Sequence, residues 1–440
     1  MPNYRHEVYW QTTEAAEPQD ALTGDVDCDV AIVGAGFTGM WTAYSLKKAR
    51  PELSIHLLDA GIAGGAASGT ADGFVTPTLG KDLDQLIRVY GEEAAGKASA
   101  IVGRSILEIG RFCRREKVDA EYEANDYLMV ALNDGQLARL EHDRKLALRL
   151  GSDTKIMDAA EARAYVDSPE IKGAVRVGGA LVNPFKLARG LVRTLRAAGV
   201  TIHERTPVLR VDPAAAPGGR HTVVTDTGLV RAPQVVLATS ASQYTFPEFR
   251  RTVLPMWSYV LISAPLTDEQ LGRVHWPGRE GLVEAKTFLH CARFTADNRV
   301  MWAGGRAYYY PRSPFDRAHH ENAAIYQELT ESFGRFFPAW KDDVRFEFAY
   351  GGVIDITRDM MPHFGSLRPG LHYGYGYCGN GIAATHTGGR ILRDLILGEQ
   401  TDYSTLAFVD ARRPNFPPEP ISFAGFQVLS RVYEWKDRRG

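Results

Sequence analysis

The chain has 440 residues, of which 45% are hydrophobic and 24% charged, and its 51 basic and 53 acidic residues nearly cancel. This composition is typical of a globular protein, and the near-neutral charge gives no electrostatic basis for binding nucleic acid or an anionic membrane surface. A chain of this length exceeds one simple core, which indicates two domains or one elaborated domain.

Residues 1–28 predict an extended lead-in whose Tyr9 and Trp10 pack onto the folded domain. The beginning MPNYRHEVYW lacks the basic-then-apolar plan of a signal peptide, and the chain has no apolar run of about 18 residues. Its four cysteines have no CxxC spacing, which is typical of a reducing cytosol and argues against a disulfide framework or a cysteine-rich metal site. We therefore expect a cytoplasmic protein that does not span a membrane.

The clearest motif is the hexapeptide GAGFTG at Gly34–Gly39, which follows the apolar strand-like run Val30–Val33. A helix is predicted from Met40 to Arg50, and a second strand-like run then ends at Asp59, twenty residues after Gly39. Three glycines permit the tight turn, the approach of a pyrophosphate and close helix packing, while the acid accepts ribose hydroxyls. A glycine-rich turn without a ligand is the alternative, but the full context predicts a dinucleotide site.

The next segment, GIAGGAASGTADGFVTP at 61–77, is rich in glycine and alanine. Such a loop after the second strand allows the backbone to approach a ligand closely. Its Ala67-Ser68-Gly69-Thr70 could present amides and hydroxyls to a pyrophosphate. The alternative is a flexible surface loop.

The middle of the chain predicts both further nucleotide-domain elements and a second region. Helices are predicted over Asp82–Arg115, Asp134–Leu150 and Glu321–Phe336, and a helix from Pro184 carries Asn183 as its N-cap. A hairpin is predicted around Asp226-Thr-Gly, followed by a buried strand from Gln234 to Thr239. Alternating runs predict an antiparallel sheet that could roof a ligand pocket, with strands at 258–263, 281–285, 287–293, 300–304 and 345–350.

A second glycine-rich strand-to-helix turn lies near the end of the chain, in Leu371–Gly398. It carries four glycines before a helix that begins near Ile382 and ends at Gly398. The N-terminus of that helix would stabilise the negative charge of a reduced flavin ring. An NAD-dependent dehydrogenase leaves this turn unexplained, and glycines that serve only close packing are the other alternative.

Eight stretches resemble, in order, the FAD-dependent amine and amino-acid oxidase superfamily (D-amino acid oxidase-like), and within it the γ-glutamylputrescine oxidase-like proteins. These stretches are VYWQTT, DVAIVGAGFTGMWTAYSL, LLDAGIAGGAASG, LVNPFKLARGL, TDTGLVRAPQVVLATSA, VMWAGGR, GGVIDITRDMMPHFG and YGYCGNGIAATHTGGRILRDLILG. The resemblance implies an α/β fold with a discontinuous FAD-binding Rossmann-type (GR2-like) domain at 1–85, 180–245 and 345–412. It further implies an interleaved α+β substrate domain, built on an antiparallel sheet, at 86–179 and 246–344, and a C-terminal tail at 413–440.

The same resemblance assigns residues to FAD. The pyrophosphate would be held by Gly34, Ala35, Gly36, Phe37 and Thr38. The adenosine would contact Asp59 and Val208, with Ala60 next to Asp59, and Thr239 would lie near the pyrophosphate. The ASG turn and the residue after it are Ala67, Ser68, Gly69 and Thr70. The turn under the flavin ring would be Gly379, Asn380, Gly381 and Ile382.

The chain also departs from its relatives, which commonly continue ASG with Arg-Asn-Gly-Gly where this chain has Thr70-Ala71-Asp72-Gly73. Asp72 is a candidate to receive a cationic amine. Arg293, Arg306 and Tyr309, on the predicted roof, are candidates to bind a substrate carboxylate. Cys378 replaces a small residue, and a buried thiol and a covalent flavin link are the two interpretations.

Two further residue types are considered for roles in catalysis or metal binding. Lys286 is a loose candidate for the oxygen-activating lysine of some relatives, with a surface role as the alternative. His290, His363 and His386 have no metal-like spacing, and we predict no metal site.

The resemblance implies oxidation of a C–N bond in a small-molecule amine or amino acid, with hydride transfer to the flavin and hydrolysis of the imine. Oxygen is the expected acceptor. The alternatives are a dehydrogenase that passes electrons to a quinone or carrier protein, and a flavin-binding protein without turnover.

Overall fold

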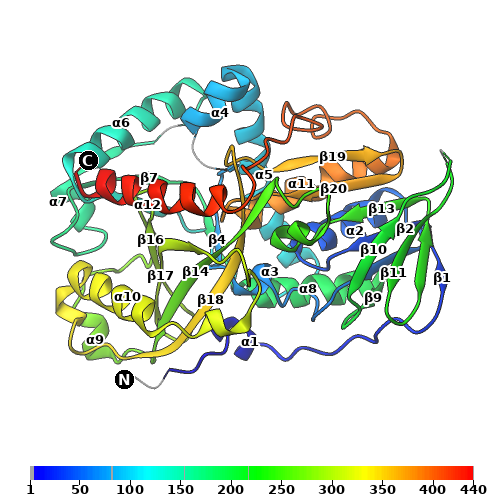
Figure 1. Cartoon of the computed structure of the whole chain (residues 1–440). Coiled ribbons are helices and arrows are strands. Elements are labelled where there is room, and N and C mark those ends of the chain that lie inside the picture. Colours follow the sequence, from blue (N-terminus) through cyan, green and yellow to red (C-terminus); the bar gives the residue numbers. More distant parts are fainter. Residues whose placement is uncertain (1–3, 81–82, 153, 217, 440) are drawn as a thin grey trace.

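The computed structural model describes residues 4–80, 83–152, 154–216 and 218–439. Figure 1 shows two parts side by side, a mostly parallel sheet with its helices on the right and a larger, mostly antiparallel sheet on the left. Each part is built from segments that are far apart in the sequence. This is the α/β architecture with an interleaved second sheet that the sequence predicts.

A six-stranded sheet forms the parallel part. Its strands are β2 (Val30–Val33), β3 (Ile55–Leu58), β9 (Thr201–His203), β13 (Gln234–Leu237), β19 (His363–Arg368) and β20 (Leu371–Tyr375). Their order is β19-β20-β13-β2-β3-β9, and every neighbouring pair is parallel except β19 with β20. All four residues of β2 are buried, as expected for a strand that is covered on both faces.

Two small sheets flank this one. The first contains β1 (Val26–Asp27), β10 (Val208–Asp212), β11 (His221–Thr225) and β12 (Leu229–Ala232), in the order β1-β12-β11-β10. It packs through Val223 and Val230 against Ala31 and Val33 of the parallel sheet. Its β11–β12 hairpin turns at Asp226–Gly228, as predicted. The second small sheet pairs β4 (Phe74–Val75) with β8 (Ala180–Leu181).

An eight-stranded sheet forms the other part. Its strands are β5 (Tyr127–Ala131), β6 (Ile156–Asp158), β7 (Gly173–Val177), β14 (Val253–Ser263), β15 (Gly281–Glu284), β16 (His290–Phe294), β17 (Val300–Tyr309) and β18 (Phe346–Thr357). Their order is β18-β14-β17-β16-β15-β5-β7-β6, and only the β15–β5 pair is parallel. The predicted strands of the antiparallel roof all belong to this sheet, so that prediction is confirmed.

The helices follow the predicted ranges closely. They are α1 (Tyr9–Thr12), α2 (Phe37–Ala49), α3 (Ala67–Thr70), α4 (Leu83–Tyr90), α5 (Glu92–Arg115), α6 (Asp134–Arg149), α7 (Ala159–Arg163), α8 (Pro184–Ala197), α9 (Asp268–Gly272), α10 (Ala323–Phe336), α11 (Gly381–Leu397) and α12 (Ile421–Arg439), with 3-10 turns η1 (Ser240–Thr245), η2 (Arg317–His320) and η3 (Pro338–Trp340). Asn183 caps α8 by accepting from the Lys186 N–H at 3.1 Å, as predicted. Gly91, with φ of 85°, divides the predicted helix of 82–115 into two, and Asp82 lies outside the described residues.

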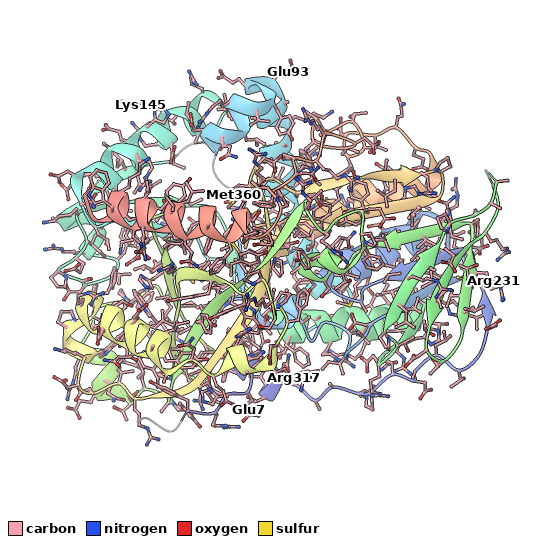
Figure 2. All side chains as sticks on the ribbon, viewed as in Figure 1. Glu7, Glu93, Lys145, Arg231, Arg317 and Met360 are labelled. Atoms are coloured by element: carbon pink, nitrogen blue, oxygen red, sulfur yellow. The ribbon has the colours of Figure 1, made fainter. Side chains whose placement is uncertain are left out.

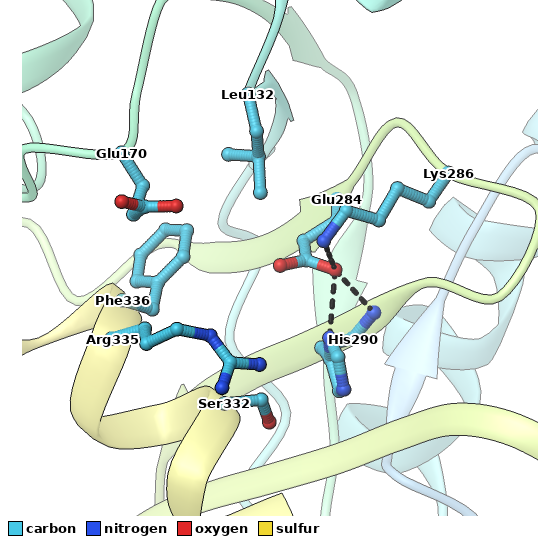
Figure 3. A pocket seen from close by; sticks show the side chains of 8 residues that line it. All are labelled: Leu132, Glu170, Glu284, Lys286, His290, Ser332, Arg335 and Phe336. Atoms are coloured by element: carbon cyan, nitrogen blue, oxygen red, sulfur yellow. Dashed lines mark hydrogen bonds and ion pairs between the residues drawn. The ribbon is translucent and has the colours of Figure 1, made fainter. Parts of the chain in front are cut away.

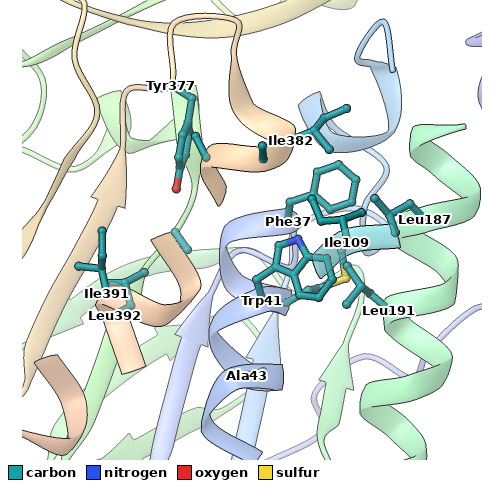
Figure 4. Close-up of a cluster of buried hydrophobic side chains, with 14 of the residues drawn as sticks. Phe37, Trp41, Ala43, Ile109, Leu187, Leu191, Tyr377, Ile382, Ile391 and Leu392 are labelled. Carbon is teal, nitrogen blue, oxygen red and sulfur yellow. The ribbon is translucent and has the colours of Figure 1, made fainter. Parts of the chain in front are cut away.

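The main hydrophobic core lies where α2 packs on α11. Figure 4 shows Trp41 within this core, with Phe37 on the same helix and Ile382 beyond it. A Cβ atom at Gly389 of α11 would lie 2.5 Å from the backbone carbon of Trp41, so the two helices approach this closely only because glycine stands there. This packing fixes the first turns of the two helices relative to each other.

Three features at the ends of the chain bear on the predictions. Tyr9 and Trp10 are buried, which confirms that the lead-in packs onto the fold. The segment predicted as a tail contains α12, drawn in red across the front of the molecule in Figure 1. No helix in the described part of the chain is both long and apolar enough to cross a membrane.

β18 begins the predicted 345–412 segment and pairs with β14 of the eight-stranded sheet along its whole length. The domain boundaries stay a prediction. Charged side chains such as Glu93 and Lys145 project from the rim of the molecule (Figure 2) and are exposed, as expected for a balanced surface charge.

Candidate functional site

The first glycine turn joins β2 to α2. Gly34 has φ of 104°, and a Cβ atom there would lie 2.4 Å from the Ala238 carbonyl oxygen. A Cβ atom at Gly39 would lie 2.0 Å from the Gly34 carbonyl oxygen. Helix α2 begins after Gly36, and its Phe37 N–H donates to Ser68 Oγ at 2.8 Å. The turn therefore excludes side chains and presents the start of a helix at the sheet edge.

Asp59 lies at the end of β3 beside this turn. One carboxylate oxygen accepts from the Ala35 N–H at 2.9 Å, and the other accepts from the Gly61 N–H at 2.8 Å. Burial raises the pKa of Asp59, and these two hydrogen bonds oppose that effect. An ionised carboxylate has about four lone-pair sites, so Asp59 can still accept ribose hydroxyls while it holds the turn.

The last glycine turn joins β20 to α11. Gly376 and Gly379 both have φ of 88°, and a Cβ atom at Gly379 would meet no described atom within 4 Å. Asn380 is the N-cap residue of α11, and its side chain makes no capping hydrogen bond to the helix. The turn is held by Asp355 of β18, whose carboxylate accepts from the Gly376 N–H at 2.7 Å and the Tyr377 N–H at 3.1 Å. Burial raises the pKa of Asp355 to about 6.

The two turns meet at one edge of the parallel sheet. β13 pairs in parallel with both β2 and β20, so the carboxyl ends of all three strands point the same way. Thr38 Oγ1 and Tyr377 Oη lie 2.7 Å apart and form a buried hydrogen bond between the turns. The prediction that these distant stretches lie together is confirmed.

The other residues predicted for the cofactor lie around this edge. Thr239 follows β13, and its hydroxyl donates to Gln243 Oε1 at 2.7 Å. Val208 begins β10, two residues after Thr206, whose N–H donates to the Asp59 carbonyl at 2.7 Å. Helix α3, which contains Ala67–Thr70, provides the Ser68 hydroxyl that meets α2. Two helix N-termini whose N-cap residues, Gly36 and Asn380, make no side-chain cap, and glycines where side chains would clash, fit an elongated anionic ligand such as FAD.

Asp72 lies in the loop between α3 and β4, against the eight-stranded sheet. Its carboxylate accepts a hydrogen bond from Cys291 Sγ at 3.4 Å. Burial raises the pKa of Asp72 to about 6, against smaller opposing effects of Cys291 and Arg293. Thr70 lies two residues earlier, where a Cβ atom at Gly352 of β18 would come within 3.1 Å of its Oγ1. The loop therefore runs across the face of the sheet that is turned toward the cofactor edge.

The three candidates for binding a substrate carboxylate have protein partners. Arg293 is 1% exposed, and its Nη1 donates to the Val182 carbonyl at 2.7 Å. Burial lowers the pKa of Arg293 to about 10. Arg306 and Tyr309 both contact the C-terminal segment, at Gln427 (2.8 Å) and Glu419 (2.7 Å) respectively. The role of these three residues in substrate binding stays a prediction. A substrate carboxylate would have to compete with the present protein partners for their hydrogen bonds.

Cys378 and Lys286 are tied to protein groups. The Cys378 thiol is buried and donates to the Gly376 carbonyl at 3.3 Å, and burial raises its pKa to about 12. This favours the interpretation of Cys378 as a small buried residue. Lys286 lies 3.0 Å from Glu284, which also accepts from His290 at 2.8 Å (Figure 3).

Figure 3 places Lys286 in a pocket with Arg335 and Ser332 of α10. The His290 ring stacks on Trp302, 5.0 Å away, within the core that lies under α10. Cys291, the next residue, points to the opposite face of β16 and meets Asp72. Lys286 thus approaches the α10 side of the sheet, away from Asp72.

Sequence reasoning missed Asp355, which orders the last glycine turn, and α12, which meets Arg306 and Tyr309. Asp355 had a signal, because it is a lone acid inside the apolar run GGVIDIT. α12 also had one, because Ile421, Val428, Val432 and Trp435 recur at helical spacing.

Comparison with known proteins agrees with this geometry. The chain is 28% identical to γ-glutamylputrescine oxidoreductase of Escherichia coli (strain K12), with 100% of both chains covered. Its fold matches glycine oxidase from Geobacillus kaustophilus (TM-score 0.73, 20% identity, covering 88% of this chain and 100% of that one). It also matches L-proline dehydrogenase from P. horikoshii (TM-score 0.70, 15% identity, covering 87% and 95%). Residues 29–395 match the FAD dependent oxidoreductase (DAO) family. The chain therefore belongs to this family, and FAD is its cofactor.

Proposed function

We propose that the protein oxidises the C–N bond of a small amine or amino acid and passes the electrons to oxygen. The observation that carries this proposal is the meeting of two glycine turns at one sheet edge, joined by the Thr38–Tyr377 hydrogen bond, with Asp355 of the second sheet holding the last turn. The names of the relatives, γ-glutamylputrescine oxidoreductase and glycine oxidase, point to amines and amino acids as substrates.

The residues that would hold FAD follow from the geometry. Gly34–Thr38 would bind the pyrophosphate at the start of α2, with Ala67–Thr70 alongside. Asp59 and Ala60, with Val208 nearby, would bind the adenosine, and Thr239 lies at the same edge. Gly379–Ile382 would lie beside the flavin ring at the start of α11. When bound there, FAD supplies a two-electron acceptor.

The protein itself binds the substrate, orients it and shields it from bulk water. The amine binds in its neutral form, and its carbon loses a hydride while the nitrogen loses a proton, which leaves an imine. Water then adds to the imine and releases ammonia or an amine together with a carbonyl product. Oxygen takes up two electrons and two protons and becomes hydrogen peroxide. The roof sheet excludes bulk water from the first of these steps.

The test uses the purified, FAD-loaded protein without oxygen. Loss of the yellow flavin absorbance on addition of an amine or amino acid would support catalysis. Peroxide release on admission of air would support an oxidase, whereas bleaching without peroxide points to a dehydrogenase that uses a quinone or carrier. Absence of bleaching with every amine and amino acid of a broad panel would contradict the proposal in favour of a flavin-binding protein without turnover.

A further inference from the structure

The environment of Asp72 defines a site that the proposed function does not use. Side chains alternate along β16, so Cys291 and Arg293 point toward the cofactor side of the sheet while His290 points toward α10. Asp72 meets this cofactor side at Cys291. It is partly exposed, whereas Cys291 and Arg293 are buried. Of these three residues, Asp72 is therefore the one that solvent still reaches.

Few protein groups offset the negative charge of the Asp72 carboxylate. No described Lys, Arg or His lies within 4.0 Å of it. Its hydrogen bond comes from a thiol, which is a weak donor. Arg293 lowers the pKa of Asp72 through its charge, but its Nη1 donates instead to the carbonyls of Val182 (2.7 Å) and Gly73 (3.2 Å). A carboxylate in such a position needs either a proton or a cationic partner.

Two further polar groups near Asp72 lack partners. Tyr350 Oη and Trp10 Nε1 are both buried, and neither has a hydrogen-bond partner among the described residues. The indole N–H is near enough to lower the phenol pKa slightly, but the geometry falls short of a hydrogen bond. Asp72 itself helps to raise the pKa of Tyr350, so the two groups are neighbours. Buried polar groups that lack hydrogen-bond partners beside a carboxylate indicate a position where a ligand or a water molecule supplies the missing hydrogen bonds.

The cations of the roof are engaged elsewhere. Arg306 contacts Gln427 at 2.8 Å and Glu434 at 3.5 Å, both on α12. Lys286 pairs with Glu284 at 3.0 Å. The described residues around Asp72 thus offer a negative charge without a free positive one.

We infer that Asp72 recognises a positively charged nitrogen of the substrate, and that the preferred substrate is a diamine or polyamine. This inference rests on the proposed function. The nitrogen that is oxidised must be neutral, and a carboxylate beside it would favour its charged form. Asp72 therefore suits a second, distant nitrogen that stays protonated. Its own pKa of about 6 means that a bound ammonium would complete its ionisation at neutral pH.

The experiment compares butane-1,4-diamine with butylamine, which has the same reacting end without the second charge. The enzyme is the FAD-loaded protein, the variant is Asp72→Asn, and the control is Asp402→Asn, an acid whose side chain is 71% exposed. We measure the anaerobic rate of flavin bleaching, and diamine binding by calorimetry. Asp72→Asn should lower kcat/KM for the diamine by about 10- to 100-fold and change that for butylamine by less than about threefold.

Several outcomes would overturn the inference while leaving the proposed function intact. They are equal bleaching by both amines in the unaltered protein, an unchanged ratio in Asp72→Asn, and an equal loss for both amines. Absence of bleaching by any amine or amino acid would instead contradict the proposed function. If Asp72→Asn does not fold, Asp72→Glu carries the test, because its longer side chain should shift the preference toward propane-1,3-diamine. An unshifted preference in that variant would overturn the inference as well.

Discussion

Replacing Tyr377 by phenylalanine removes one hydroxyl from the contact between the two glycine turns. The ring remains in the core, so the change tests the hydrogen bond to Thr38 at 2.7 Å rather than the packing. Thr38 is 5% exposed, and its hydroxyl would lose this partner without gaining bulk water. An unpaired buried hydroxyl costs about 1–3 kcal/mol, and this is the loss of unfolding free energy that we expect for the apoprotein.

A double-mutant cycle separates this bond from other effects. Thr38→Val leaves the Tyr377 hydroxyl unpaired, and that hydroxyl belongs to a residue 4% exposed, so the expected cost is similar. The double variant removes both hydroxyls, so no buried hydroxyl is left without a hydrogen-bond partner. Its loss should therefore be smaller than the sum of the single losses by about 1–2 kcal/mol.

The assay is urea unfolding of the apoprotein, followed by tryptophan fluorescence. Tyr308→Phe is the matched control, because the Tyr308 hydroxyl meets Glu328 at 3.3 Å at the surface. FAD titration of Tyr377→Phe should give a Kd raised about 5- to 10-fold, since the two turns are less well preorganised. Additive losses within about 0.3 kcal/mol, or an FAD affinity equal to that of the unaltered protein, would refute this account of the site.

Three further predictions concern the same architecture. Gly39→Ala should abolish FAD binding, measured as flavin absorbance of the purified protein, because its Cβ would lie 2.0 Å from the Gly34 carbonyl oxygen. Arg189→Met should lower the unfolding free energy in urea by about 3–5 kcal/mol, because it strips the buried Glu204, which is 0% exposed, of its 3.1 Å ion pair. Asp355 has a folded-state pKa of about 6 against 3.8 ordinarily, so apoprotein stability should fall as pH rises from about 4 to above 6. Asp355→Asn should remove about 3 kcal/mol of that pH dependence, and an unchanged pH profile would contradict the assignment.

The elements that the sequence predicts well are those decided within a few neighbouring residues. Asn183 followed by proline predicts the start of α8, and the cap forms as expected. Gly398, with φ of 67°, ends α11 where the pattern places it. The GAGFTG turn is local only in part. Gly39 is required by a contact within the turn, with the Gly34 carbonyl oxygen, whereas Gly34 is required by the Ala238 carbonyl oxygen, which follows β13.

The roles of Arg306 and Tyr309 could not be predicted in this way. Both side chains contact residues more than 100 positions later in the chain, on or next to α12. The segment 413–440 was predicted as a tail, so nothing in the local sequence of β17 indicated that these side chains would have partners. A side chain on a strand can be assigned to a face from alternation, but what covers that face is decided by tertiary structure.

The geometry of the cofactor edge follows from strand order more than from any residue that would touch FAD. β13 lies between β2 and β20, and because parallel strands end at the same edge, both glycine turns must arrive there. Neither turn carries information about the other. Asp355 adds the remaining constraint, since it belongs to the other sheet and holds the last turn by two backbone N–H groups. A change in the packing of the eight-stranded sheet would therefore be transmitted to the last glycine turn through Asp355. This is why we expect a residue outside the nucleotide-binding motifs to affect the site.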